Sequence, residues 1–116
     1  GVRDTVRYHL NWLVGHPRPA TFLLQQPFAG YRSDRVPEEL VRRNGQFLAT
    51  VHGWLDRRTA ARELRALPFD VVVALMIAPV HHWVRGMLYH DAAAAALKAP
   101  ETAEVLAEGA WRALRP

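Results

Sequence analysis

The sequence contains no cysteine, and this absence excludes a disulfide framework, thiol catalysis and zinc–thiolate sites. Glycine and proline are also scarce, since 7 Gly and 8 Pro stand among 116 residues, of which 50% are hydrophobic. This composition is typical of one globular domain with a single core and excludes a disordered chain. The N-terminus is polar and lacks the apolar segment of a signal peptide, so we expect a cytoplasmic protein.

Lysine is nearly absent, because arginine supplies all the basic residues except Lys98. Residues 1–65 carry eleven arginines and six acidic residues, a balance of +5, whereas residues 66–116 have a balance of −1. The excess could indicate nucleic-acid binding. However, Glu38 and Glu39 stand four residues before Arg42 and Arg43, which is typical of ion pairs along a solvated helix. We therefore expect no direct DNA contact by this chain.

Long apolar runs are missing as well. The longest, Val71 to Val80, contains Pro79 and is half of the roughly twenty residues that a membrane span needs. We expect no membrane association.

Helical periodicity dominates the chain and predicts an all-α, five-helix domain over residues 1–116. The first helix follows from Val2, Val6, Leu10 and Leu13 and ends at Gly15. The second begins at Pro17 and runs to about Phe28, and a loop covers 29–37. The third runs from Pro37 to between Thr59 and Leu64, the fourth from Pro68 to about His90, and the last from Pro100. The alanine run 92–96 favours a helix by propensity but has little to bury, so its state stays open.

The fourth helix is apolar in every direction, because eight apolar residues follow one another from Val71 to Ala78. Such a helix must be buried all round, and a small domain has too little chain to cover it. We predict that the last two long helices form a four-helix bundle with a second copy. The alternative is a central core helix in a monomer. The predicted dimer interface comprises Val72, Leu75, Met76, Pro79, Val80, Trp83, Val84, Met87, Ala103, Leu106, Ala110, Trp111 and Leu114.

Metal binding and catalysis find little support in the sequence. His81 and His82 are adjacent, so their side chains diverge by roughly 100° on a helix, and no two histidines have the spacing of a helical metal pair. No phosphate-binding loop, nucleophile elbow or His–carboxylate motif is present. The sequence therefore predicts neither an enzyme nor a metal or cofactor site.

Three segments carry a resemblance to a known family. They read LNWLVGHPRPATFLLQQ, PEELVRRNGQFLATVHGWL and ELRALPFDVVVALMIAPVHHWVRGML. Together they resemble the ligand-binding and dimerisation domain of tetracycline-repressor-like (TetR/AcrR) transcriptional regulators. The family often has glycine where Ala78 stands, and glycine in the turn near Arg62. The resemblance covers nearly the whole chain.

The resemblance implies the effector domain of a bacterial repressor whose N-terminal helix-turn-helix head is absent from this chain, which begins with Gly1. It further implies a homodimer in which a small molecule binds among the first three helices and lowers operator affinity. We expect a hydrophobic or aromatic effector at Tyr8, Trp12, Phe22, Asn44, Phe47, Val51, His52 and Trp54. The alternatives are packing of these aromatic residues in the core and, for the whole chain, a dimeric adaptor module without a DNA-binding head.

Overall fold

The computed structural model describes residues 1–25 and 38–116, and these residues form helices and short turns without a strand. The elements are α1 (Val2–Gly15), α2 (Pro17–Gln25), α3 (Glu38–Ala60), α4 (Phe69–Met76), α5 (Ala78–His90) and α6 (Ala92–Leu114). The all-α prediction is confirmed. The predicted end of the second helix near Phe28 and the loop 29–37 lie outside the described residues. One compact unit holds α1, α2 and α4 to α6, and a second holds α3.

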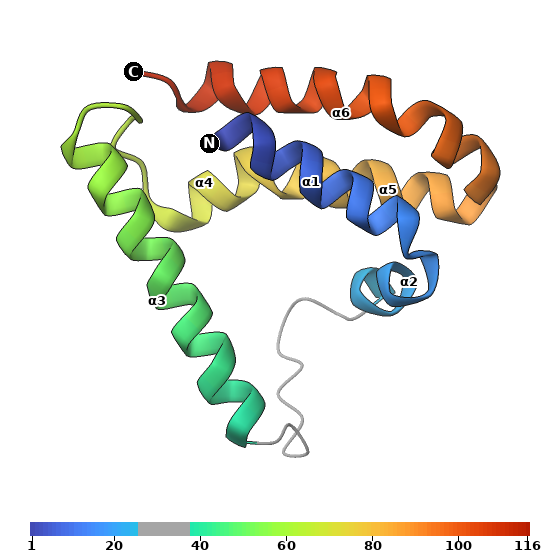
Figure 1. The fold of residues 1–116 in the computed structure, drawn as a ribbon, viewed down its shortest axis with the longest axis horizontal. Coiled ribbons are helices and arrows are strands. Elements are labelled where there is room, and N and C mark those ends of the chain that lie inside the picture. The colour runs from blue at the N-terminus through green and yellow to red at the C-terminus, as the bar shows by residue number, and fades with distance from the viewer. Residues whose placement is uncertain (26–37) are drawn as a thin grey trace. The chain divides into compact units, whose positions relative to one another are not determined.

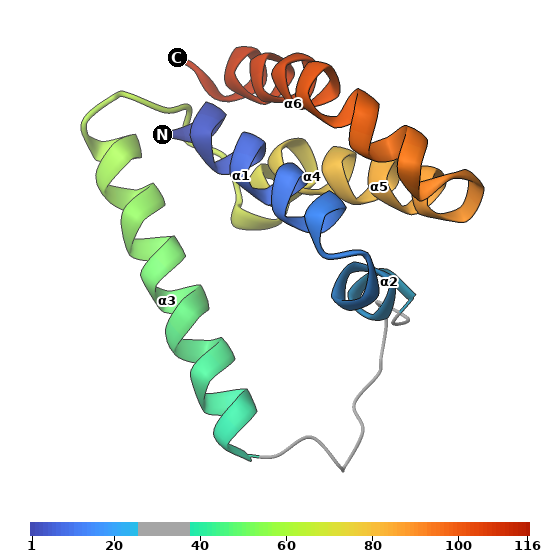
Figure 2. The same cartoon turned by 45° about the vertical axis from the view of Figure 1, so that its right-hand side comes forward.

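The core of the first unit is a close antiparallel contact between α1 and α6 (Figures 1 and 2). Both helices place one stripe in this contact, with residues every three or four positions. From α1 come the large side chains and from α6 mainly alanines, whose small side chains let two helices approach closely. The stripes consist of Val2, Val6, Leu10 and Leu13 on α1, and of Ala95, Ala99, Ala103, Ala107, Ala110 and Leu114 on α6, and none of these residues is more than 4% exposed.

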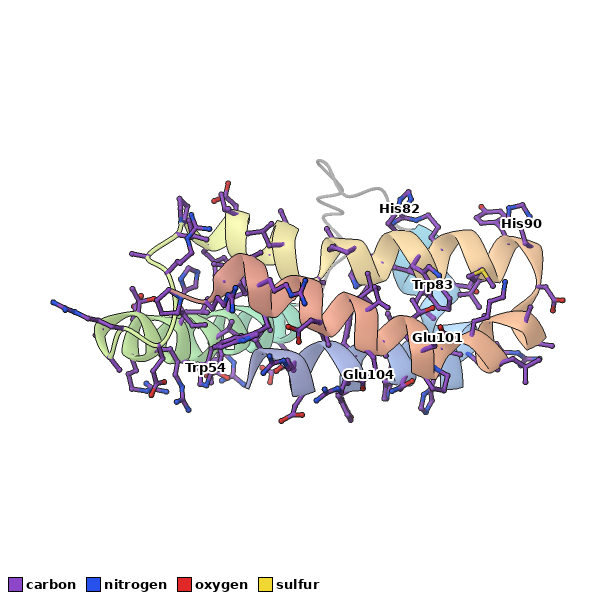
Figure 3. All side chains as sticks on the ribbon, turned by 90° about the horizontal axis from the view of Figure 1, so that it is seen from above. Trp54, His82, Trp83, His90, Glu101 and Glu104 are labelled. Atoms are coloured by element: carbon purple, nitrogen blue, oxygen red, sulfur yellow. The ribbon has the colours of Figure 1, made fainter. Side chains whose placement is uncertain are left out.

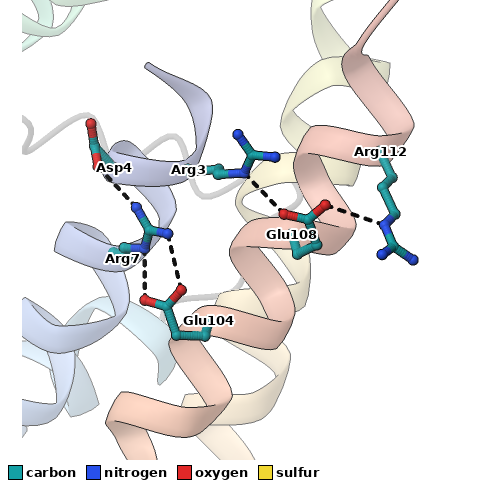
Figure 4. A network of polar contacts seen from close by, with 6 residues as sticks. All are labelled: Arg3, Asp4, Arg7, Glu104, Glu108 and Arg112. Atoms are coloured by element: carbon teal, nitrogen blue, oxygen red, sulfur yellow. Dashed lines mark hydrogen bonds and ion pairs between the residues drawn. The ribbon is translucent and has the colours of Figure 1, made fainter.

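A network of ion pairs runs along the rim of this contact (Figure 4). The Arg7 guanidinium donates two hydrogen bonds to the Glu104 carboxylate, at 2.7 and 2.9 Å. The Nε of Arg3 donates to Glu108 at 3.0 Å, and Arg112 donates to the other oxygen of Glu108 at 3.2 Å. Because both cross-helix pairs are exposed, the network fixes the register of the helices more than it adds stability.

The segment predicted as one helix from Pro68 to His90 is divided into α4 and α5 at Ile77. Pro79 lies in the first turn of α5 and explains the break. Proline has no N–H, and its ring clashes with the carbonyl four residues earlier, which belongs to Leu75. The sequence-based expectation of a single helix is therefore corrected to two helices.

The alanine run also departs from the expected boundaries, because α6 starts at Ala92 and continues through Pro100. The cause is Asp91, whose carboxylate accepts hydrogen bonds from the N–H groups of Ala93 and Ala94 at 3.0 and 3.2 Å. This cap provides an acceptor for backbone N–H groups that otherwise have no hydrogen-bond partner in the first turn of a helix. In addition, Ala95 and Ala99 are buried, so the run does have a face to bury.

The second unit contains α3, which is followed by a turn where Arg62 has an unusual backbone conformation. The N–H of Glu63 donates to the carbonyl of Arg58 at 2.9 Å, and Arg62 has a φ of 58°. This left-handed conformation closes many helices and favours glycine, because other residues have a Cβ that crowds the backbone. Arg62 thus occupies the turn where the resembled family often has glycine.

Residues 69–90 together have the length of a membrane span, and an 18-residue window within them has a mean hydropathy of 1.5. The core helices of soluble proteins have the same length and composition.

The alanine stripe predicts a strong penalty for a larger residue. Ala103→Leu adds volume to a side chain that is 1% exposed, and overpacking of this kind costs about 1–3 kcal/mol. Urea unfolding followed by circular dichroism measures the free energy of unfolding. Ala96→Leu, at an exposed position of the same helix, is the matched control. Equal unfolding midpoints for the two variants would contradict the close contact.

The ion-pair network predicts a pH-dependent contribution from Glu108. Hydrogen bonding by Arg3 holds the pKa of the Glu108 carboxyl below its ordinary value of 4.5. The native state therefore gains stability from this group above pH 4.5 and loses it as the pH falls through the lower native pKa. Glu108→Gln should lower the urea midpoint at neutral pH but leave it unchanged in acid, once wild-type Glu108 is protonated. Glu101→Gln, at an exposed position of the same helix, serves as control. If Glu108→Gln still lowered the urea midpoint in acid, the pH-dependent contribution of the Glu108 carboxylate would be refuted.

Candidate ligand pocket and histidine pair

A pocket of about 200 Å³ lies between α2 and α5 within the first unit. Leu24 and Leu88 give it apolar walls, and Thr21, Arg85 and Tyr89 add polar groups. Residues 85, 88 and 89 share one face of α5, since they are three and four positions apart, and residues 21 and 24 share one face of α2. The volume is smaller than that of a typical drug-sized site, so the pocket suits a small molecule or one end of a larger one.

Arg85 connects the two walls of this pocket. Its Nε donates a hydrogen bond to the backbone carbonyl of Leu24 at 3.3 Å, near the end of α2. Within residues 1–25 and 38–116, no carboxylate forms an ion pair with Arg85. The hydroxyl of Thr21 already donates to the carbonyl of Pro17 at 2.7 Å. The pocket therefore presents a guanidinium beside two leucine side chains.

A pair of histidines stands where α1 meets α5. The Nε2 atoms of His9 and His81 lie 2.8 Å apart, and the ring centroids are separated by 5.0 Å. Because the two nitrogen atoms are within hydrogen-bond distance, one ring donates its Nε2–H and the other accepts. This contact connects α1 directly to α5.

Burial keeps both histidines in the neutral form. It lowers the pKa of His9 below the ordinary value of 6.5. It also lowers the pKa of His81, and the positive charges of a protonated His9 and of Arg85 lower it further. Each ring is only partly exposed, and a charged imidazole would lose hydration there. At neutral pH the pair thus consists of two neutral imidazoles that share one hydrogen bond.

The predicted ligand residues are divided between the two units, with three on α1 and α2 and five on α3. On α1, Tyr8 is 71% exposed, and Trp12 stacks on His16 at a centroid distance of 4.4 Å. On α3, in the second unit, His52 is exposed, whereas Val51 and Trp54 are partly buried. The side chains of Phe22, Asn44 and Phe47 lie outside the described residues. The predicted pocket among the first three helices stays a prediction.

The thirteen predicted interface residues divide into two groups. Seven are buried within the chain, and a partner could not reach them in this conformation. These are Val72, Met76, Val80, Val84, Ala103, Ala110 and Leu114, each at most 8% exposed. The rest are partly exposed and comprise Leu75, Pro79, Trp83, Met87, Leu106 and Trp111. Among these, Trp111 is covered on one side by the guanidinium of Arg3, 5.1 Å from the ring centroid.

Sequence reasoning missed the residues that the structure does bring together. None of the five described residues that line the α2–α5 pocket was predicted, and His9 and His81 were not paired. Spacing shows which residues share a helix face, but not which faces meet. The two histidines are 72 positions apart, so no local signal could have joined them.

The chain was also compared with protein-family models, with curated proteins and with solved structures. No match was found in any of the three comparisons.

Proposed function

We propose that this chain is the effector-binding and dimerisation domain of a ligand-responsive transcriptional repressor of the TetR-like type. The observation that carries the proposal is an apolar face on α4, α5 and α6 that the described residues of the first unit leave partly exposed. The pocket between α2 and α5 and the sequence resemblance support the same conclusion.

The face consists of two neighbouring stripes. Leu75, Pro79, Trp83 and Met87 recur every fourth residue along α4 and α5, and all four are partly exposed. On α6 the corresponding stripe is Thr102, Leu106, Gly109 and Ala113. Seen from above, Trp83 lies between α5 and α6 (Figure 3). A large aromatic side chain on an accessible apolar face is typical of protein–protein contacts.

A second copy of the chain fits this face better than an unrelated partner. Gly109 and Ala113 leave room for a helix to approach, while Trp83 and Leu106 provide apolar area to bury. A two-fold axis through the face would place the α5–α6 pairs of two copies together as a four-helix bundle. The proposed interface excludes the seven residues that already form the core.

The pocket supplies the effector site in this proposal. α5 lines the pocket with Arg85, Leu88 and Tyr89 and also carries Trp83 of the proposed interface. A ligand that binds between α2 and α5 can therefore influence the position of the helix that contacts the second copy. It changes DNA affinity only if it binds the released state more tightly than the DNA-competent one.

Sedimentation velocity tests the proposed interface. We expect the chain to sediment as a dimer and Leu106→Arg to sediment as a monomer. The substitution places two like charges in the two-fold contact at a cost of several kcal/mol, which corresponds to at least about a hundredfold weaker association. Leu97→Arg is the control, because Leu97 is 85% exposed on the opposite side of α6. A monomeric parent chain, or equal dissociation of both variants, would reject the interface.

The repressor role requires a separate test on the complete reading frame. We expect the DNA that encodes this chain to specify a helix-turn-helix segment before Gly1. The full product should bind DNA near its own gene and release it when a small hydrophobic molecule stabilises the protein. A start codon at or just before Gly1, or DNA binding that no stabilising molecule changes, would favour the adaptor module instead.

A further inference from the structure

His9 and His81 form the only close contact between two histidine side chains among the described residues, and it joins separate helices. α1 supplies one imidazole and α5 the other, and the two Nε2 atoms face each other at 2.8 Å. Neither residue belongs to the proposed pocket or to the proposed dimer interface.

We propose that His9 and His81 form a binding site for a divalent transition-metal ion, which would bridge α1 and α5. Neutral imidazole nitrogen is a preferred ligand of Zn²⁺, Ni²⁺ and Cu²⁺. The ring that donates the hydrogen bond must move its proton from Nε2 to Nδ1, which leaves two Nε2 lone pairs for the ion.

The distances are close to those that a metal requires. Two zinc–nitrogen bonds of about 2.0 Å at a tetrahedral angle place the nitrogen atoms about 3.3 Å apart. The present Nε2–Nε2 separation is 2.8 Å. An opening of about 0.5 Å is therefore sufficient, and rotation of the imidazole rings can supply it because the outer torsion of histidine has a broad minimum.

The remaining coordination positions would hold water. No group of three or more histidine or acidic side chains that could hold a metal occurs in the described residues, so these residues supply two ligands, His9 and His81. Arg85 stands one helical turn after His81, and its positive charge disfavours a second cation nearby. We therefore expect a weaker site than a structural zinc site, with open positions for an outside ligand.

Isothermal titration calorimetry with ZnCl₂ on the intact chain tests the proposal. We expect one Zn²⁺ per chain, and binding about a hundredfold weaker in His9→Gln and His81→Gln, because each substitution removes one arm of a chelate. His82→Gln and His16→Gln are matched controls, since both histidines are exposed and follow His81 and His9 by one and seven positions in the sequence. These two variants should bind Zn²⁺ as the parent chain does.

A second measurement identifies the ligands without any substitution. In ¹⁵N NMR spectra of the histidine rings, Zn²⁺ should shift the Nε2 signals of His9 and His81 and leave those of His16 and His82 in place. This readout holds even if a glutamine variant unfolds. The proposal is overturned if the exposed histidines respond instead, if the control variants lose as much affinity as His81→Gln, or if no Zn²⁺ binds.

Discussion

The close antiparallel contact between α1 and α6 is the constraint on which the rest of the first unit depends. It is possible because α6 offers alanines where α1 offers valine and leucine, so that one helix fills the space that the other leaves. The cross-helix pairs Arg3–Glu108 and Arg7–Glu104 then fix the register. With α1 held in this register, His9 meets His81 of α5. The contact between α1 and α6 therefore also brings His9 and His81 together.

Much of the fold could be predicted from the sequence because helical periodicity is a local property. The stripe Val2, Val6, Leu10 and Leu13 was predicted from spacing alone, and all four residues are buried. The helix boundaries were predicted wrongly at positions where a single proline or aspartate decides whether the helix begins, ends or continues. Pro79 divides a predicted helix, whereas Pro100 lies inside α6, which its other backbone hydrogen bonds and the buried alanines hold together. The cap at Asp91 was missed, although an aspartate before an alanine run is a sequence signal for a helix start.

The candidate site could not be predicted in the same way, because it depends on which helix faces meet. Thr21 and Leu24 share a face, as do Arg85, Leu88 and Tyr89, but nothing in the spacing shows that these two faces enclose a pocket. The aromatic residues of the predicted ligand site follow only from the chemistry of their side chains. Tyr8 shows that a large side chain on a predicted helix can point to solvent, since it is 71% exposed.

The apolar segment 71–78 shows how burial divides between the chain and a proposed partner. Val72 and Met76 turn inward and leave Leu75 partly exposed between them. Pro79 and Trp83 continue the outward stripe in α5, while Val80 and Val84 continue the inward one at 0% exposure. The break at Ile77 therefore preserves both stripes although it interrupts the helix. A segment that is apolar in every direction thus has two apolar faces. The chain itself buries one of them, and the other is available to the proposed second copy.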